Sequence, residues 1–311
     1  MSTSLFQTPE WGDFKCQTGW SKQHRLDGIL VLEKKLPLGR TMLYSPMINE
    51  AQGRRLKAGG FLEQIKNIAQ KRNAIFYRVE FDTPLPTFDL KPSTFGARRA
   101  FEEMQPEHTL ILDITQSEEE ILAQMKPKGR YNIKVAERSG IEITESTDPK
   151  GPELDSFYTL YESMAKRQRI SYRDKKYFEA LLEILGKKDY ARLYDASVNI
   201  DGKTTTLASA IVGNFDRRVT YLFGGSSNEH RNLMAPYLLH WQIIKDARAQ
   251  GCTEYDLFGI APNDDPKHPW AGVTRFKKQF GGREVHLAGN WDLVFRPVEY
   301  QSFKIVEKIR R

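Results

Sequence analysis

A segment near the C-terminus combines cations and aromatic rings in a pattern that suits a phosphate-bearing ligand. Residues 266–283 include no Asp or Glu and carry the cations Lys267, Arg275, Lys277, Lys278 and Arg283. The aromatic residues Trp270, Phe276 and Phe280 lie between them. Because cations neutralise phosphates and rings stack on bases, a nucleotide or an RNA end would fit this segment. A helix that buries its Phe side chains and solvates its lysines would show the same spacing.

A second group of cations is expected on one helix. The Ser-x-x-Glu capping box at Ser117 predicts a helix that runs to about Met125, and a further helix follows from about residue 128 to 139. On that further helix Arg130, Lys134 and Arg138 are four residues apart and share one face. This face either contacts phosphates or is a solvated surface.

Composition narrows the class of protein. The 311 residues are 40% hydrophobic and carry 47 basic against 40 acidic side chains, which permits a polyanionic partner without requiring one. The two cysteines, Cys16 and Cys252, are far apart in sequence, and the six histidines are scattered, so we predict no disulfide framework and no metal site. No apolar run reaches signal-peptide or membrane-span length, which predicts a cytoplasmic protein.

The pattern of apolar residues predicts an α/β chain with strands and helices interleaved. In the first half we expect strands at 28–32, 41–44 and 74–81, a helix at 54–71 and a proline-rich connector at 83–95, followed by strands at 110–114 and 141–144. In the second half we expect helices at 154–168 and 175–185, strands at 191–199, 205–213 and 219–224, a helix opening at Pro236, and a strand at 255–258. Asp201-Gly202 predicts a tight hairpin between the first two of these strands.

This order of elements resembles the N-acetyltransferase (GNAT) fold, and the first half repeats it loosely. We therefore expect two tandem GNAT-like domains, at residues 1–145 and 146–295, with a C-terminal helix at 296–311 that packs back on the first domain. The segment 154–185 is too short for a long inserted helical arm.

Five segments in order resemble the Fem (FemABX) family, the bacterial transferases that add amino acids from aminoacyl-tRNA to peptidoglycan precursor peptides. The segments are 7–20, which includes Gln7-Thr8-Pro9-Glu10-Trp11-Gly12, then 125–140, 221–241, Tyr255-Asp256-Leu257-Phe258-Gly259, and 275–282. Ser45-Pro46-Met47 stands where the family usually has Gly-Pro.

The resemblance implies roles for individual residues. Phe276 and Lys277 resemble the pair beside the reacting ester, where a ring stacks on the terminal adenine and an ammonium offsets developing negative charge. Lys15 and Arg217 resemble the residues that contact the diphosphate of the precursor, and Tyr221 and Tyr255 resemble tyrosines of the acceptor cleft, although both tyrosines could equally be core residues. Further contacts with tRNA would come from Arg275, Lys278, Arg130, Lys134 and Arg138. We expect Lys15, Arg217 and Lys277 to line one cavity.

The resemblance also implies an activity and its partners. The expected reaction is attack by the amine of a stem peptide, on lipid II or UDP-MurNAc-pentapeptide, on the ester of aminoacyl-tRNA, by a monomer without a cofactor. Peripheral contact with the inner face of the membrane is compatible with the basic surface.

Two alternatives stay open. An acyl-CoA-dependent GNAT enzyme needs a glycine-rich turn, but Arg231-Asn232-Leu233-Met234-Ala235-Pro236 has Met and Pro where glycines belong. A non-catalytic RNA-binding protein would also have basic and aromatic residues, but it would have no use for the acceptor-type residues Lys15 and Arg217.

Overall fold

The chain folds into two compact units. The computed structural model describes residues 4–57, 60–85, 92–168 and 170–310. The first unit comprises residues 1–107 and 286–311, and the second comprises residues 108–285. The division therefore falls after Glu107 and not near residue 145. Residues 108–145 lie in the second unit because their strand pairs with its sheet and their helix 127–138 packs against its long helix 235–249.

The first unit is built on a mixed sheet with the strand order β1-β2-β3-β4-β12, and β5 pairs with β12. β3 and β4 are parallel, and the other neighbours are antiparallel. The strands are β1 (Lys22–Leu26), β2 (Ile29–Leu36), β3 (Arg40–Ile48), β4 (Ala74–Pro84), β5 (Arg98–Arg99) and β12 (Arg283–Val294). The helices described in this unit are α1 (Pro9–Gln17), α2 (Glu50–Lys57), α3 (Gly60–Lys71) and α10 (Pro297–Arg310).

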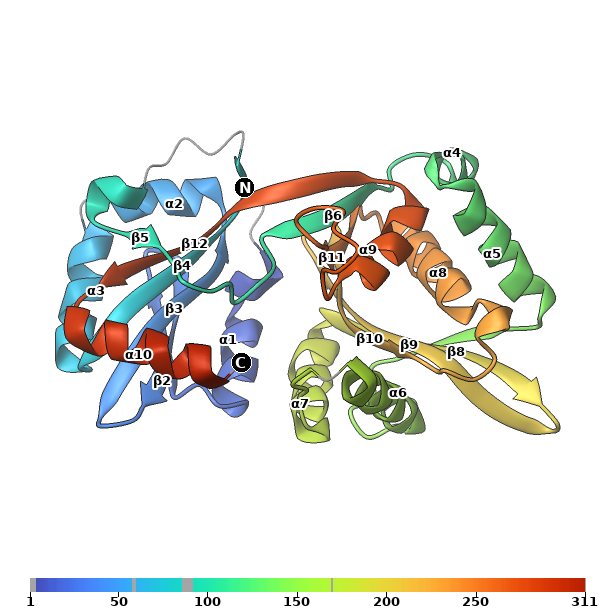
Figure 1. The fold of residues 1–311 in the computed structure, drawn as a ribbon, viewed down its shortest axis with the longest axis horizontal. Coiled ribbons are helices and arrows are strands. Elements are labelled where there is room, and N and C mark those ends of the chain that lie inside the picture. The colour runs from blue at the N-terminus through green and yellow to red at the C-terminus, as the bar shows by residue number, and fades with distance from the viewer. Residues whose placement is uncertain (1–3, 58–59, 86–91, 169, 311) are drawn as a thin grey trace. The chain divides into compact units, whose positions relative to one another are not determined.

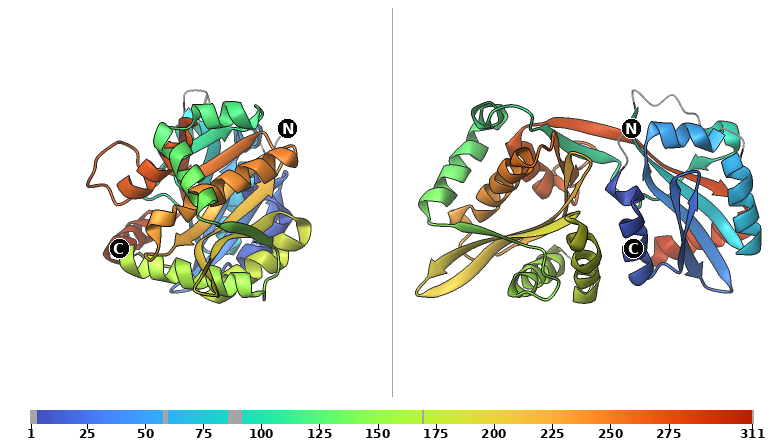
Figure 2. Two further views of the ribbon diagram at one scale, coloured as in Figure 1. Left: turned by 90° about the vertical axis from the view of Figure 1, so that its right-hand side faces the viewer. Right: turned by 180° about the vertical axis from the view of Figure 1, so that it is seen from behind.

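Alternation along β4 explains how helices cover both faces of this sheet. Successive residues of a strand point to opposite faces. The ring of Tyr77 lies 6.0 Å from that of Phe61 on α3, whereas the ring of Phe76 lies 5.3 Å from that of Tyr300 on α10. α3 and α10 therefore pack on opposite faces of the sheet (Figure 1, Figure 2).

The second unit has the strand order β6-β11-β10-β9-β8-β7, in which only β10 and β11 are parallel neighbours. The strands are β6 (His108–Asp113), β7 (Glu142–Ser146), β8 (Ala191–Ile200), β9 (Lys203–Phe215), β10 (Arg218–Ser226) and β11 (Glu254–Gly259). The helices described here are α4 (Glu118–Gln124), α5 (Pro127–Arg138), α6 (Pro152–Gln168), α7 (Lys175–Leu185), α8 (Ala235–Ala249) and α9 (Ala271–Lys277). α5 and α8 lie on one side of the sheet, and α6 and α7 lie on the other (Figure 1).

The two units repeat one topology. In each, an antiparallel meander leads into helical structure, and the next strand returns parallel to the last strand of the meander. A strand distant in sequence then pairs antiparallel with the returning strand, β12 with β4 in the first unit and β6 with β11 in the second. This repeat is the tandem arrangement that the order of elements predicted.

Most local predictions agree with the structure. Ser117 forms the predicted capping box with Glu120, and Asp201 and Gly202 both have positive φ in the β8–β9 turn. The single helix expected over 54–71 is two helices, α2 and α3, and residues 58–59 lie outside the described residues. The connector expected over 83–95 also falls partly outside them, at 86–91. Sequence patterns did not predict α1, β1 or β12.

The first unit contains a fully buried arginine, Arg78. Arg78 on β4 donates to both carboxylate oxygens of Asp292 on β12, at 2.7 and 2.8 Å, and to Glu102 at 3.2 Å. The hydroxyl of Tyr300 donates to the same Asp292 at 2.6 Å. Because Tyr300 belongs to α10, this cluster ties the C-terminal helix to the sheet.

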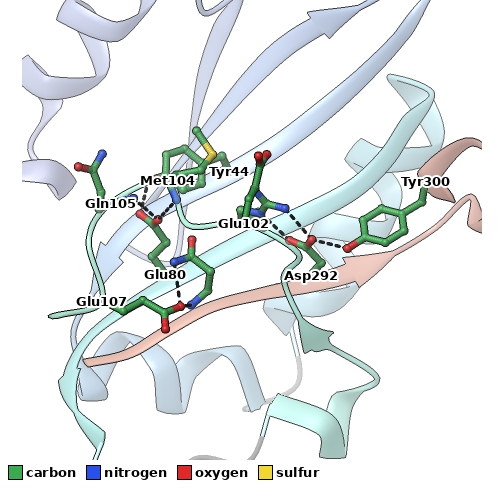
Figure 3. A network of polar contacts seen from close by, with 10 residues as sticks. Tyr44, Glu80, Glu102, Met104, Gln105, Glu107, Asp292 and Tyr300 are labelled. Carbon is green, nitrogen blue, oxygen red and sulfur yellow. Dashed lines mark hydrogen bonds and ion pairs between the residues drawn. The ribbon is translucent and has the colours of Figure 1, made fainter. Parts of the chain in front are cut away.

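Glu80 is a second buried carboxylate, and it lies near the Arg78 cluster. Glu80 accepts hydrogen bonds from the backbone N–H groups of Met104 and Gln105, at 3.2 and 2.8 Å, and from the hydroxyl of Tyr44 (Figure 3). Burial outweighs these donors and raises the pKa of Glu80 to about 7. Glu80 thereby holds the segment before β6 against β4.

Candidate active site

The parallel strands β10 and β11 separate part-way along their length. Pairing between them ends at Thr220 and Asp256, although both strands continue beyond these residues. At this point β10 has a register shift against β9 next to Tyr221, and β11 has a left-handed backbone at Phe258, with φ +61°. Beyond the separation β10 no longer supplies backbone partners to the end of β11, so side chains can take that place.

Lys277, the last residue of α9, fills this place. Its side chain is buried, at 5% exposure, and its Nζ donates to the backbone carbonyl of Gly259 at 2.7 Å. The same Nζ lies 5.6 Å from the centroid of the Tyr221 ring. The ammonium therefore bridges the separated ends of β10 and β11.

The burial of this ammonium changes its acidity. Loss of solvent lowers the pKa of Lys277 to about 8, and the negative charge of Asp256 limits the fall. Asp256 is itself buried, and its carboxylate accepts from the backbone N–H of Phe258 at 2.8 Å and from the hydroxyl of Thr109. Burial raises the pKa of Asp256. A lysine with a pKa near 8 is still mostly charged at neutral pH and can stabilise negative charge.

A buried histidine lies next to the lysine. The ring of His240, on α8, lies 4.7 Å from that of Tyr221, and its Nδ1 is 2.7 Å from the hydroxyl of Tyr255. Burial and the positive charge of Lys277 lower the pKa of His240 to about 3, so the imidazole is neutral at physiological pH. A neutral ring can lie beside the ammonium without repelling it.

Tyr221 and Tyr255 differ in their surroundings. Tyr221 is half-buried, and burial raises its pKa to about 12. Tyr255 is completely buried, and its hydroxyl is used by His240. Tyr255 is therefore placed as a core residue that positions His240, which agrees with the core alternative, and the role predicted for it toward the acceptor stays a prediction.

The Phe residues of this segment pack as well. Phe280 is buried, and the half-buried ring of Phe276 lies 5.1 Å from Tyr237, 5.4 Å from His240 and 5.4 Å from Phe280. For these two rings, the structure agrees with the alternative stated for this segment, a helix that buries its Phe side chains. That alternative does not describe Lys277, which is buried where it expected a solvated lysine.

Arg217 lies elsewhere in the second unit. It is exposed in the turn before β10, with φ +67°, and its carbonyl accepts from the N–H of Thr253 at 2.7 Å. β11 begins at Glu254, next to Thr253, and Gly259 is its last residue, five residues further on, which corresponds to about 17 Å in a strand. Arg217 and Lys277 therefore lie at opposite ends of β11, and the expectation that they line one cavity is wrong for this pair.

Lys15 belongs to the first unit. It lies near the end of α1, and its Nζ is 5.8 Å from the ring centroid of Trp11 and 5.4 Å from that of Phe14. The two rings hold the ammonium at a half-buried position. The role predicted for Lys15 toward a diphosphate stays a prediction.

The remaining cations have different surroundings. Arg130 donates to the carbonyls of Leu122 and Ala123, at 3.3 Å each, and to that of Met125, so it caps the end of α4. The ammonium of Lys278 pairs with two carboxylates, Asp264 at 2.8 Å and Glu284 at 2.7 Å. Three cations predicted to contact tRNA are exposed: Lys134, Arg138 and Arg275.

Sequence reasoning missed the partners of Lys277. His240 is one of the six scattered histidines, for which no site was predicted, and the carbonyl of Gly259 gives no signal in a sequence. One signal was present, because Tyr237 and His240 are three residues apart on a helix and share a face. That face packs on Phe276 and Phe280.

The turn before α8 has few free amides for a pyrophosphate. The N–H groups of Leu233, Met234 and Tyr237 donate to nearby backbone carbonyls at 2.9, 3.2 and 3.0 Å, and Pro236 has no N–H. A CoA pyrophosphate would need these donors.

The part of the chain that the structure describes shows no cluster of metal ligands and no membrane-spanning helix, and its hollow between β8 and α8 is separate from the Lys277 cluster. Within it, no group of three or more His, Cys, Asp or Glu side chains is placed to hold a metal ion. None of its helices combines the length and apolarity needed to cross a bilayer. A hollow of about 340 Å³ lies between β8 and α8 and is lined by Tyr194, Gln242 and Asp246 among others, but the Lys277 cluster does not reach it.

Comparison with known proteins decides the family. The model of the FemAB family matches residues 94–209 and 194–308, which together span more than half of the chain. The chain belongs to the FemAB family. The resemblance seen in five segments of its sequence is thereby confirmed.

Individual relatives of this FemAB protein are distant but extend over nearly the whole chain. A lipid II:glycine glycyltransferase of Staphylococcus saprophyticus is 22% identical over 383 aligned positions, which cover 98% of this chain and 91% of the relative. A lipid II:glycine glycyltransferase of Staphylococcus aureus is also 22% identical, with the same coverage. The aligned length exceeds 311 residues because the relatives carry insertions that this chain lacks.

Solved structures confirm the architecture of this FemAB protein. The crystal structure of FemX superimposes with a TM-score of 0.85 at 22% identity, over 96% of this chain and 94% of FemX. A tandem GNAT protein from the clavulanic acid biosynthesis pathway gives a TM-score of 0.50 at 12% identity, over 87% of this chain and 81% of that protein. The expected α/β fold with two GNAT-like units is therefore confirmed.

Proposed function

We propose that this FemAB protein is an aminoacyltransferase that moves an amino acid from aminoacyl-tRNA to the amine of a peptidoglycan precursor stem peptide. The observation that carries the proposal is the Lys277 ammonium, held by Gly259 and Tyr221 between the separated ends of β10 and β11. The names of the relatives, lipid II:glycine glycyltransferases, support the class of acceptor.

The reaction needs little from the protein beyond positioning and charge. The acceptor nitrogen attacks the ester carbonyl carbon of the aminoacyl group, a C–N bond forms, and the bond to the ribose oxygen breaks. The proton lost by the amine balances the proton gained by the leaving ribose hydroxyl. Aligning amine and ester can supply about 7 to 11 kcal/mol, and no covalent enzyme intermediate is required.

Lys277 is suited to the charged step. As the tetrahedral centre forms, its carbonyl oxygen becomes negative, and an ammonium in a dry site stabilises that charge strongly. An ammonium has three N–H donors, and one of them is used by the carbonyl of Gly259. The others can face the reacting oxygen.

Proton transfer from the amine has no evident protein base in this cluster. The buried His240 is neutral, but its Nδ1 is already engaged by Tyr255. Asp256 accepts from Thr109 and from the backbone of Phe258. The base is therefore assigned to a substrate group or to water.

The tRNA end would meet the exposed cations of the second unit. Arg275 lies on α9 two residues before Lys277, and the half-buried ring of Phe276 lies between them in sequence. A terminal adenine beside Phe276 would place its ester near Lys277, with phosphates toward Arg275. On the acceptor side we keep Lys15 as the proposed diphosphate contact.

The test is a transfer assay with defined substrates. Purified protein is incubated with a mixed pool of labelled aminoacyl-tRNAs and either lipid II or UDP-MurNAc-pentapeptide, and the acceptor is analysed by mass. An added amino-acid mass on one acceptor supports the proposal and identifies the donor and the acceptor together. Transfer from acetyl-CoA with none from tRNA, or binding of tRNA without any transfer, would overturn it.

A further inference from the structure

The first unit displays an apolar stripe on the outer face of α10. Val298, Ile305 and Ile309 are 78%, 61% and 78% exposed, and their spacing of seven and four residues places them on one helix face. Ser302 lies on the same face, and its hydroxyl donates to the carbonyl of Val298 at 3.3 Å. The only hydroxyl of this stripe is therefore already bonded within the helix, which lowers the cost of moving it out of water.

The turn between β2 and β3 extends the apolar surface. Arg40, which closes this turn, pairs with Glu299 of α10 at 3.2 Å, so the turn lies beside the first turn of the helix. At the tip of the turn Leu38 is 95% exposed and has a left-handed backbone, with φ +59°. This position of a tight hairpin favours Asn or Gly, so the leucine brings both backbone strain and an exposed apolar side chain.

Cations flank both parts of the surface. Lys308 is exposed beside the stripe on α10, and Lys34 is exposed on β2 near the turn. Glu299, the acidic residue at the start of the helix, is neutralised by Arg40 at 3.2 Å and by Arg296 at 3.5 Å. An apolar face with a basic border is the pattern of helices that lie in the interface of an anionic bilayer.

We propose that the outer face of α10 and the β2–β3 turn form the surface with which this protein rests on an anionic lipid bilayer. The apolar side chains would enter the boundary between headgroups and acyl chains, and the lysines would lie at the level of the phosphates. The proposal rests on the proposed function for its purpose, because a lipid-linked acceptor is met at the membrane. Its test does not require transfer activity.

The test is co-sedimentation with vesicles of phosphatidylcholine, with and without phosphatidylglycerol. The variant Ile305→Asp/Ile309→Asp changes the proposed surface, and Leu38→Asp changes the turn. The control Tyr131→Asp/Ile170→Asp introduces the same two charges at exposed apolar residues of the second unit. All of these side chains are exposed, and unchanged unfolding transitions establish that each variant is folded.

We expect the wild type to bind the anionic vesicles. The affinity of Ile305→Asp/Ile309→Asp should be lower by about tenfold or more, that of Leu38→Asp should also be lower, and that of the control should be unchanged. Binding of the first variant at wild-type strength would overturn the proposal, as would no binding by the wild type. Dimerisation of the wild type that the first variant abolishes would also overturn it, by assigning the stripe to a second copy. Transfer to detergent-solubilised acceptor, lipid II or UDP-MurNAc-pentapeptide, should survive in Ile305→Asp/Ile309→Asp and in Leu38→Asp. Absence of transfer to both acceptors by the wild type would count against the proposed function alone.

Discussion

Replacing Lys277 by methionine should separate catalysis from stability. Methionine keeps most of the side-chain volume but removes the ammonium and its hydrogen bond to Gly259. If Lys277 stabilises the charge that develops on the ester oxygen, kcat should fall about 10²- to 10³-fold, as when one such donor is removed elsewhere. The KM for the acceptor should change little.

The same substitution should not lower the stability of the protein. In the unfolded chain lysine has a pKa of 10.5, and in the folded protein burial lowers the pKa of Lys277 to about 8. Holding the charged form buried therefore costs about 3 kcal/mol at neutral pH, at 1.36 kcal/mol for each unit. The methionine variant does not bury a charge and so lacks this cost. It loses about 1 to 3 kcal/mol of stability because the Gly259 carbonyl is left without its donor. The free energy of unfolding should stay level or rise.

The sign of the pH dependence follows from the same shift. Between pH 8 and 10.5 the folded wild type binds fewer protons than the unfolded chain, so its stability should rise across this range, and this rise should be absent in Lys277→Met. The assays are single-turnover transfer and urea unfolding, each on the wild type, Lys277→Met and Lys278→Met. Because Lys278 is already paired with two carboxylates, its variant should lose far less activity. A large loss of stability with transfer rates intact in Lys277→Met would refute the reasoning.

Three further predictions concern the interior. Tyr255→Phe leaves the buried His240 Nδ1 without its partner and should lower the free energy of unfolding by about 1 to 3 kcal/mol in urea titrations; an unchanged midpoint would show that the contact contributes nothing. Because the pKa of Glu80 is raised from 4.5 to about 7, its contribution is full below pH 4.5 and is lost as the pH rises through 7, so Glu80→Gln should flatten the pH dependence of stability between pH 4.5 and 7; equal slopes in the two proteins would contradict this. Asp292→Asn leaves the buried Arg78 without its main ion pair and should lower the free energy of unfolding by about 3 to 5 kcal/mol. Glu102→Gln, at the rim of the same cluster, should lower it by less. Thermal unfolding compares the two variants, and the reverse order would contradict the burial argument.

Predictions from the sequence succeeded where local chemistry decides the structure. Ser117 and Glu120 satisfy each other's backbone donors, and Asp201-Gly202 fits a turn that needs positive φ, so both could be placed from a few neighbouring residues. The order of elements in the second unit also follows from local periodicity. That order, with the family segments, was enough for the fold and for the choice of Lys277.

Predictions failed where contacts between segments distant in sequence decide the structure. β12 is a strand whose partners are β4 and β5, and β6 joins the second unit by pairing with β11, so neither the long C-terminal strand nor the boundary after Glu107 has a local signal. Arg217 and Lys277 looked compatible with one site because sequence does not show which end of a strand a residue occupies. The burial of Lys277 depends on the separation of β10 and β11, which begins at a register shift that only pairing reveals.

Photo-crosslinking tests most directly where the reacting ester binds. A non-hydrolysable aminoacyl-tRNA, with an amide in place of the ester and an azidoadenosine at its 3′ end, is irradiated with the protein, and the labelled peptides are mapped by mass spectrometry. We predict labelling of Phe276 or of its neighbour Tyr237, which competing aminoacyl-tRNA abolishes. Labelling confined to residues 1–107 and 286–311 would contradict the assignment of the reaction to the Lys277 cluster.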